Sequence, residues 1–156
     1  MTRRSLRTAA IALLVAGLAA TAPRAQTKAG ATPQLRVYKS PTCGCCANWV
    51  RYMQANGFTA TTTEMTDVTP MKVQNGVPAR AYSCHTTLVA GYVIEGHVPV
   101  EDIRRLLKEK PAIAGLAAPG MPAGSPGMDV PNSPSYDVVA FDKAGKVSVF
   151  ATHTPK

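Results

Sequence analysis

Charged and aromatic residues are both scarce in this sequence. Of the 156 residues, 17% are charged and 6% are aromatic, whereas 46% are hydrophobic. So little charge with so much apolar material excludes a disordered chain and predicts one packed domain. The net charge of +8 does not indicate nucleic-acid binding, because four of the arginines lie within the first 25 residues and no basic stripe alternates with aromatic side chains. We expect no nucleic-acid partner.

The sequence also lacks an apolar run long enough to cross a membrane. Residues 8–22 carry no charge and follow a basic head that contains Arg3, Arg4 and Arg7. The apolar run of roughly 15 residues falls short of the ~20 that a bilayer requires. A basic head before a short apolar stretch is typical of a signal peptide, and the Arg3-Arg4 pair also resembles a twin-arginine signal.

We therefore expect residues 1–25 to be a signal peptide that is removed on export, and residues 26–34 to be a polar tether. After cleavage the protein would have no stable insertion in a membrane. Its expected location is the oxidising bacterial periplasm, where unprotected thiols tend to form disulfides.

The rest of the chain predicts alternating strands and helices. Strands are expected at 35–38 and 58–64, hairpins at 86–94 and 136–150, and helices at 46–56, 67–74 and 99–110. Strand–helix–strand followed by hairpin–helix is the order of a thioredoxin-like α/β domain, with a central sheet and flanking helices. We assign residues 35–150 to this domain, which includes a C-terminal β-hairpin. The first strand-to-helix turn would hold the cysteine cluster.

Residues 115–134 differ in composition from the rest of the domain. Nine of these twenty residues are Gly or Pro, so we expect no regular element there. The segment nevertheless keeps Leu116, Met121, Met128 and Val130, which a free linker would not need. We expect an ordered loop wrapped over the domain rather than a flexible linker.

Three of the four cysteines fall within Cys43-Gly44-Cys45-Cys46. At a helix N-terminus the exposed backbone N–H groups and the helix dipole favour the thiolate. A thiolate is both the nucleophile of disulfide exchange and a ligand for soft metals, so the motif alone does not choose between these roles. A structural disulfide, with Cys84 as one candidate partner, is a third interpretation.

Other candidate ligands lie further along the chain. A thioredoxin-like layout would bring Cys84 and His85, at the start of the third strand, close to the first cluster. His97, just before a helix, is an additional candidate, whereas His153 is expected to be solvated. Met121 and Met128 each follow a glycine in the loop, and their thioether sulfur would suit Cu(I), although both could instead anchor the loop by packing.

Several motifs in the same order resemble a bacterial family of small exported metal-binding domains, the CopG-like copper-resistance family. The resemblance rests on Tyr38 to Cys46, Gly76 to Pro78, Ser83 to Thr86, Gly91 to Pro99, and Gly115 to Met128. It covers nearly all of the mature chain. It implies a thioredoxin-like fold, copper binding through Cys, His and Met, and a role in copper detoxification.

We therefore predict an exported copper-binding protein of copper resistance or homeostasis rather than an enzyme. Its expected ligands are Cys43, Cys45, Cys46, Cys84, His85, His97, Met121 and Met128. Clustered thiolates favour Cu(I). Zinc would suit Cys and His equally well, so the choice of copper depends on the resemblance. Expected partners are copper ions and other periplasmic copper-handling proteins.

Two alternatives remain open. One is a thiol-disulfide oxidoreductase in which Cys43 attacks and Cys46 resolves. The other is a disulfide-stabilised domain that only binds another protein.

Overall fold

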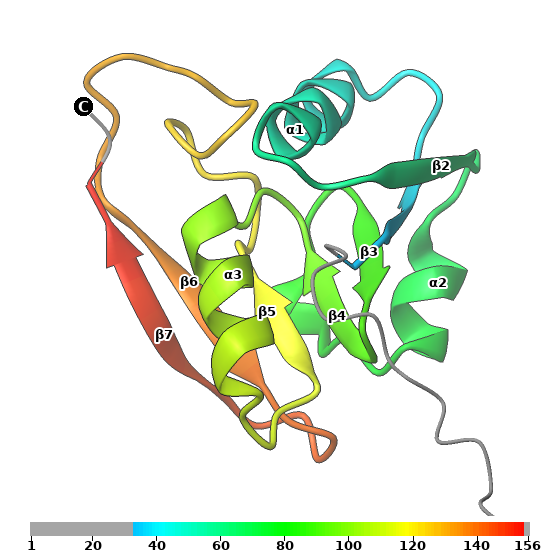
Figure 1. Cartoon of the computed structure of the whole chain (residues 1–156), viewed down its shortest axis with the longest axis vertical. Helices are drawn as coiled ribbons and strands as arrows, with labels where there is room; N and C mark the ends of the chain where they lie inside the picture. The colour runs from blue at the N-terminus through cyan, green and yellow to red at the C-terminus, as the bar shows by residue number, and fades with distance from the viewer. Residues whose placement is uncertain (1–32, 155–156) are drawn as a thin grey trace, which may run out of the picture. The chain divides into compact units, whose positions relative to one another are not determined.

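The computed structural model describes residues 33–154, which form a mixed α/β domain around one seven-stranded sheet (Figure 1). The elements are β1 (Leu35–Lys39), α1 (Gly44–Ala55), β2 (Ala60–Glu64), α2 (Thr69–Gln74), the 3₁₀ turn η1 (Ala79–Ala81), β3 (Thr86–Val89), β4 (Tyr92–Glu95), α3 (Val100–Glu109), β5 (Gly115–Ala117), β6 (Tyr136–Phe141) and β7 (Val147–His153). The expected signal peptide and most of the expected tether lie outside the described residues. Within residues 33–154, no helix is both long and apolar enough to span a bilayer.

The strand order of the sheet is β2-β1-β3-β4-β5-β6-β7. Strands β1 and β2 are parallel because α1 carries the chain back between them. Strand β3 is antiparallel to both β1 and β4. Strand β5 runs parallel to β4 and antiparallel to β6, and the β6–β7 hairpin completes the sheet.

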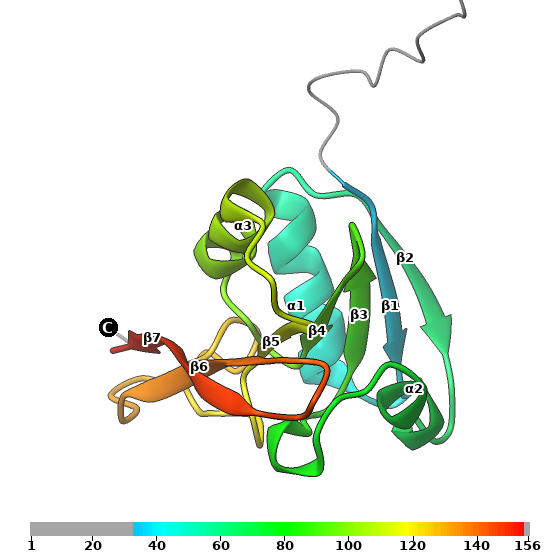
Figure 2. The same cartoon turned by 90° about the horizontal axis from the view of Figure 1, so that it is seen from below.

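The larger hydrophobic core lies between the sheet and helices α1 and α3 (Figure 2). Trp49 and Met53 are four residues apart on α1, and Ile103 and Leu106 are three apart on α3, so each pair lies on one helix face. All four side chains are fully buried. They pack with strand residues that include Leu35, Val37, Ile94, Leu116 and Val138.

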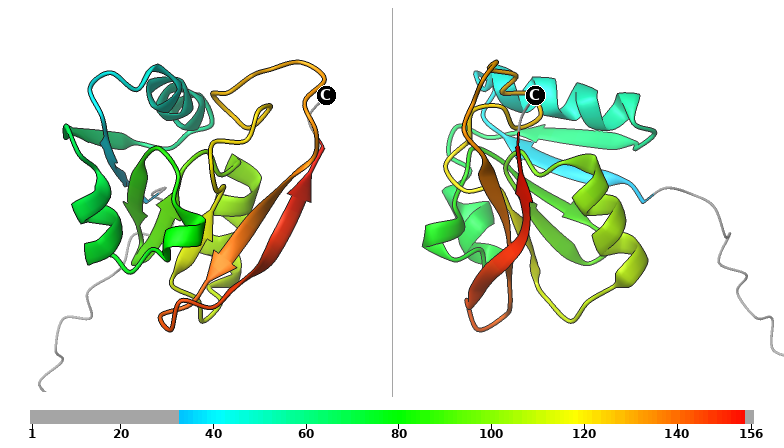
Figure 3. Two further views of the ribbon diagram at one scale, coloured as in Figure 1. Left: turned by 180° about the vertical axis from the view of Figure 1, so that it is seen from behind. Right: turned by 90° about the vertical axis from the view of Figure 1, so that its left-hand side faces the viewer.

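A second, smaller core includes residues of the chain between α2 and β3. It contains Val77, Ala81, Val93, Ala117 and Phe141. Helix α2 lies on the side of the sheet away from α1 and α3 (Figures 2 and 3). The middle of the sheet is therefore packed on both faces, and charged side chains that reach its α2 side must find partners there.

The expectation of no regular element at 115–134 is wrong for its first three residues, which form β5. Gly115 explains why this short strand fits between its neighbours. A Cβ on Gly115 would collide with the Val93 carbonyl and lie 2.7 Å from the Phe141 ring, so only glycine allows the backbones to approach this closely. The rest of the segment is a loop that contacts the domain, for example through the Gly120 N–H, which donates to the Tyr82 carbonyl at 3.0 Å.

Candidate metal centre

Three connections of the fold bring the candidate ligands together. Cys43 caps the N-terminus of α1, where its sulfur accepts a hydrogen bond from the Cys46 N–H at 3.3 Å. Cys84 and His85 immediately precede β3, and His97 lies in the short connection from β4 to α3. Each ligand therefore lies at or beside the end of a regular element, which fixes its backbone.

Among residues 33–154, these side chains form two overlapping groups. The first contains Cys43, Cys45, Cys46 and Cys84, and the second contains Cys46, Cys84, His85 and His97. Within each group, one ligand atom from every residue lies within 4.8 Å of the others. Cys46 and Cys84 belong to both groups, so the two sets form one continuous cluster of soft sulfur and imidazole nitrogen donors.

Cys43 and Cys46 are joined by a disulfide, whereas Cys45 and Cys84 are free. The alternative that paired Cys84 in a structural disulfide does not agree with this connectivity. The Cys45 sulfur lies 3.5 Å from the Cys43 sulfur. In this state two of the six Cys and His side chains are tied to each other, so reduction is needed before either can bind a metal as a thiolate.

His97 is held by the loop that follows β5. Its Nδ1 lies 2.7 Å from the Pro126 carbonyl, which can only accept, so Nδ1 carries the proton. The other nitrogen, Nε2, then has a lone pair and faces the Cys84 sulfur at 2.9 Å. Burial lowers the pKa of His97, although the Pro126 carbonyl opposes this shift. A neutral imidazole with its free nitrogen toward a thiol is the form that binds metal.

His85 is fully buried beside two other rings. Its centroid lies 4.6 Å from that of Trp49 and 5.2 Å from that of His97. Its Nδ1 is 3.5 Å from the Cys84 sulfur, and its Nε2 has no hydrogen-bond partner among the described residues. Burial first, then the charges of His97 and Lys72, hold the pKa of His85 well below its usual range. An uncharged, buried imidazole with an unpaired nitrogen suits a metal ligand.

The Cys84 thiol keeps its proton when no cation is present. Burial, followed by the neighbouring Cys45, raises the pKa of Cys84 to about 12. A metal ion supplies the positive charge that this pocket lacks, so metal binding would release the proton at neutral pH. In the metal-free site, a protonated Cys84 thiol therefore lies beside two neutral imidazoles.

The loop carrying Met121 and Met128 reaches the cluster through its backbone. A Cβ on Gly127 would lie 2.8 Å from both the Cys45 carbonyl and the Trp49 nitrogen, so this glycine packs directly on the first turn of α1. Met128 is half-buried, whereas Met121 is 42% exposed. The loop therefore lies close to the thiols, and metal binding by either thioether stays a prediction.

His153 is half-buried and paired, whereas the sequence predicted a solvated side chain. Its Nε2 lies 2.7 Å from the Asp102 carboxylate, and its ring stacks on Tyr136 with centroids 5.4 Å apart. This contact joins β7 to α3 and takes no part in the cysteine cluster. Sequence reasoning also missed Pro126, since a backbone carbonyl leaves no residue-type signal.

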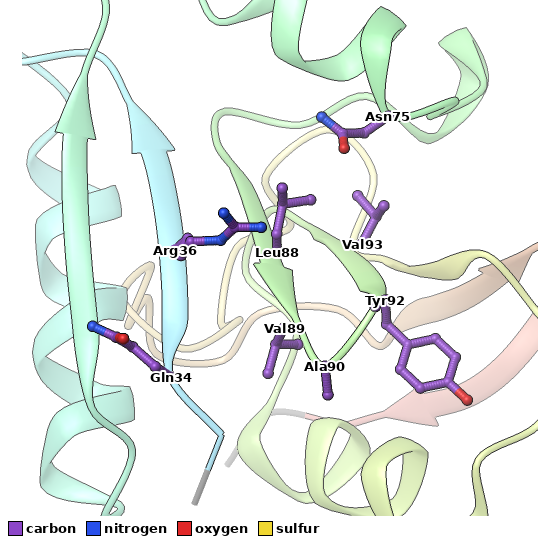
Figure 4. A pocket seen from close by; sticks show the side chains of 9 residues that line it. Gln34, Arg36, Asn75, Leu88, Val89, Ala90, Tyr92 and Val93 are labelled. Atoms are coloured by element: carbon purple, nitrogen blue, oxygen red, sulfur yellow. The ribbon is translucent and has the colours of Figure 1, made fainter.

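A separate hollow of about 410 Å³ lies beside the β3–β4 turn, with Arg36 and Asn75 on its walls (Figure 4). No cysteine or histidine lines it, so it is not part of the candidate metal centre.

A family model and two solved structures resemble this chain. The family model, described as a protein of unknown function, DUF411, matches residues 81–128, the stretch that contains Cys84, His85 and His97. A structure of the copper resistance protein copG in its form 2 is 39% identical, covers 79% of this chain and 99% of its own, and has a TM-score of 0.74. The form 1 structure is 40% identical, covers 79% and 98%, and has a TM-score of 0.73. No curated protein matches.

Proposed function

Because the chain belongs to the CopG-like copper-resistance family, we propose that it is an exported protein that binds copper as Cu(I) and acts in copper resistance. The Cys/His cluster supports a metal-related function, and the likeness favours copper. Thiolate and imidazole are the donors that copper prefers over oxygen ligands.

One observation carries this proposal furthest: the group of Cys46, Cys84, His85 and His97, in which all but Cys84 are buried. The Pro126 carbonyl directs the free nitrogen of His97 at Cys84, and His85 has a buried nitrogen without a partner. Cys43 and Cys45 extend the site toward solvent, and Met121 and Met128 are proposed to complete it. The same Cys₂His₂ group would also suit zinc, so the metal must be identified by experiment.

We test the function by measuring the metal content and Cu(I) affinity of reduced, untagged protein. Cys84→Ser replaces a soft thiolate shared by both groups with a hard hydroxyl, so we expect Cu(I) affinity to fall at least ~10-fold, or about 1.4 kcal/mol. Cys45→Ser makes the same chemical change at a residue of only one group, and its loss should be smaller. Wild-type protein that holds zinc and does not compete for Cu(I) would contradict the proposal.

Export and fold form part of the same proposal. Residues 1–25 would be the signal peptide, 26–34 the tether, and 35–150 a thioredoxin-like metal-binding domain in the periplasm, where other copper-handling proteins could exchange copper with it. The strand order β2-β1-β3-β4, with α1 between β1 and β2, supports a thioredoxin-like description. N-terminal sequencing of the periplasmic protein tests the cleavage site.

A second candidate function is thiol-disulfide exchange, which the Cys43–Cys46 disulfide at the N-terminus of α1 favours. In its reduced form, Cys43 would attack a substrate disulfide, and Cys46 would then displace the substrate thiol, leaving the protein oxidised by two electrons. Reduction of insulin disulfides by the metal-free protein, lost in Cys43→Ser, would support this activity. No reduction above the background rate would exclude it for that substrate.

A further inference from the structure

A buried ion pair contacts the residues on either side of Cys84 and His85. Lys72 of α2 and Glu95 of β4 are 6% and 0% exposed, and the Lys72 ammonium contacts the Glu95 carboxylate. Buried charges are costly to desolvate, and hydrophobic side chains of similar size could fill the same space. The pair therefore needs an explanation beyond packing, and its other contacts supply one.

The Glu95 carboxylate holds both flanks of the Cys84-His85 dipeptide. Oε1 accepts a hydrogen bond from the Ser83 N–H at 2.7 Å, and Oε2 accepts one from the Thr86 hydroxyl, also at 2.7 Å. Ser83 and Thr86 are the residues immediately before and after the two ligands. Lys72 adds a contact of 3.3 Å to the Thr86 hydroxyl, so both charged groups converge on this short segment.

The same strand end also fixes His97. Glu95 is followed by Gly96, whose N–H donates to the His85 carbonyl at 2.8 Å, and then by His97. Gly96 has φ of +71°, and a Cβ there would collide with the Ser83 side chain. The segment that carries Cys84 and His85 is thus in direct backbone contact with the segment that carries His97. The Glu95 carboxylate binds the first segment, and the Glu95 backbone leads into the second.

We propose that Glu95, paired with Lys72, is a positioning residue that holds Cys84, His85 and His97 in their mutual arrangement for metal binding. This proposal rests on the proposed function, because it assigns these side chains a common ligand. The charge of Glu95 strengthens these hydrogen bonds. A carboxylate has acceptor oxygens only, so it can accept from the Ser83 N–H, the Thr86 hydroxyl and Lys72 at the same time.

The central test is Glu95→Gln in the full mature chain. Glutamine keeps the shape, but its NH₂ group must face one of the donors that now point at the carboxylate. We expect Cu(I) affinity to fall at least tenfold in competition with a Cu(I)-specific chelator, and the X-ray absorption spectrum of bound copper to lose nitrogen ligands relative to sulfur. Glu64→Gln is the control, because it makes the same chemical change at an exposed carboxylate, which pairs with Lys39 of β1. Its affinity and spectrum should match the wild type.

A copper-independent readout separates this proposal from the proposed function. In reduced, metal-free protein, a loosened segment should let iodoacetamide alkylate Cys84 at least fivefold faster relative to Cys45. If the wild type does not bind Cu(I) but Glu95→Gln still accelerates alkylation, the proposed function fails and the positioning role stands. A folded Glu95→Gln protein with unchanged affinity, spectrum and alkylation rate overturns the positioning role.

Thr86→Val keeps the inference testable if Glu95→Gln does not fold. It removes only the hydroxyl that donates to Oε2, with little change in volume. We expect Cu(I) affinity to fall about threefold. The X-ray absorption spectrum should lose nitrogen ligands relative to sulfur, as in Glu95→Gln. If Thr86→Val folds with wild-type affinity and spectrum while Glu95→Gln is unfolded, Glu95 serves stability alone and the proposal is overturned.

Discussion

The two clustered histidines are held toward the thiols by different means. His97 is directed by a hydrogen bond from Nδ1 to the Pro126 carbonyl, whereas His85 is fixed by ring packing against Trp49. Both rings are buried, and both pKa values are lowered mainly by that burial. At the level of single residues, burial therefore keeps both imidazoles uncharged at neutral pH, the form in which a ring nitrogen can bind a cation.

This arrangement makes the stability of the metal-free protein depend on pH. Below the unfolded pKa of His, about 6.5, the unfolded chain takes up protons that buried His85 and His97 do not, so the free energy of unfolding falls as the pH falls. Replacing His85 with Leu should reduce the loss between pH 6.5 and 5.5 by up to about 1 kcal/mol. Urea unfolding at both pH values measures this difference, and equal losses in the two proteins would contradict it.

At the scale of elements, the loop after β5 passes beside one end of α1 (Figures 1 and 3) and packs on its first turn. It supplies the Pro126 carbonyl to His97 and packs Gly127 on the backbone of Cys45 and Trp49. An exposed helix N-terminus would leave a bound Cu(I) ion open to water and oxidant. The loop could therefore shield bound copper from water and oxidant, whether or not its methionines bind the metal, and this role can be tested.

Gly127→Ala tests how the loop is seated. Its φ of +84° is strained for alanine, and the new Cβ would lie 2.8 Å from the Cys45 carbonyl. We expect a destabilisation of about 1–3 kcal/mol and a several-fold faster release of Cu(I) to a chelator. Gly120→Ala is the control, because Gly120 lies in the same loop with φ of +67° but open space around its Cβ position. Equal effects of the two substitutions would mean that backbone strain, and not contact with α1, determines the result.

The thioethers of the loop are tested by replacing Met121 and Met128 together with Leu. Leucine keeps the size and apolarity but has no sulfur, so we expect weaker Cu(I) binding with little change in the melting temperature of the metal-free protein. Met65→Leu, at a half-buried methionine outside the loop, provides the control. Normal copper binding with lowered stability would show that both methionines serve packing.

At the scale of the whole molecule, local signals predicted more than long-range ones. The cysteine turn, α1 and α3 follow from residue spacing, and the β3–β4 hairpin from two short runs around Ala90-Gly91. Strand β5 and the contact of His153 with Asp102 depend on segments distant in sequence, so composition gave no sign of them. Glu95 did carry a signal, because a charged residue directly after the apolar run from Tyr92 to Ile94 requires a partner where the strand is buried.

The redox state of the cluster links the whole chain to its expected compartment. In the structure Cys43 and Cys46 form a disulfide, and neither sulfur can then act as a thiolate ligand. An oxidising periplasm would keep metal-free protein in this form. We therefore expect oxidised apo protein to take up less Cu(I) than protein that has been reduced and then freed of reductant.

The measurement is a Cu(I) titration under anaerobic conditions, with the free thiols counted before and after. Oxidised protein should start with two free thiols, Cys45 and Cys84, and reduced protein with four. Cys43→Ser is the informative variant, because it removes one partner of the disulfide and should make Cu(I) uptake less dependent on prior reduction. Full uptake by the oxidised wild type, with the Cys43–Cys46 disulfide still intact, would instead assign copper binding to Cys45, Cys84 and the histidines. The Cys43–Cys46 pair would then be left for thiol exchange, since a disulfide that persists beside bound copper cannot supply its ligands.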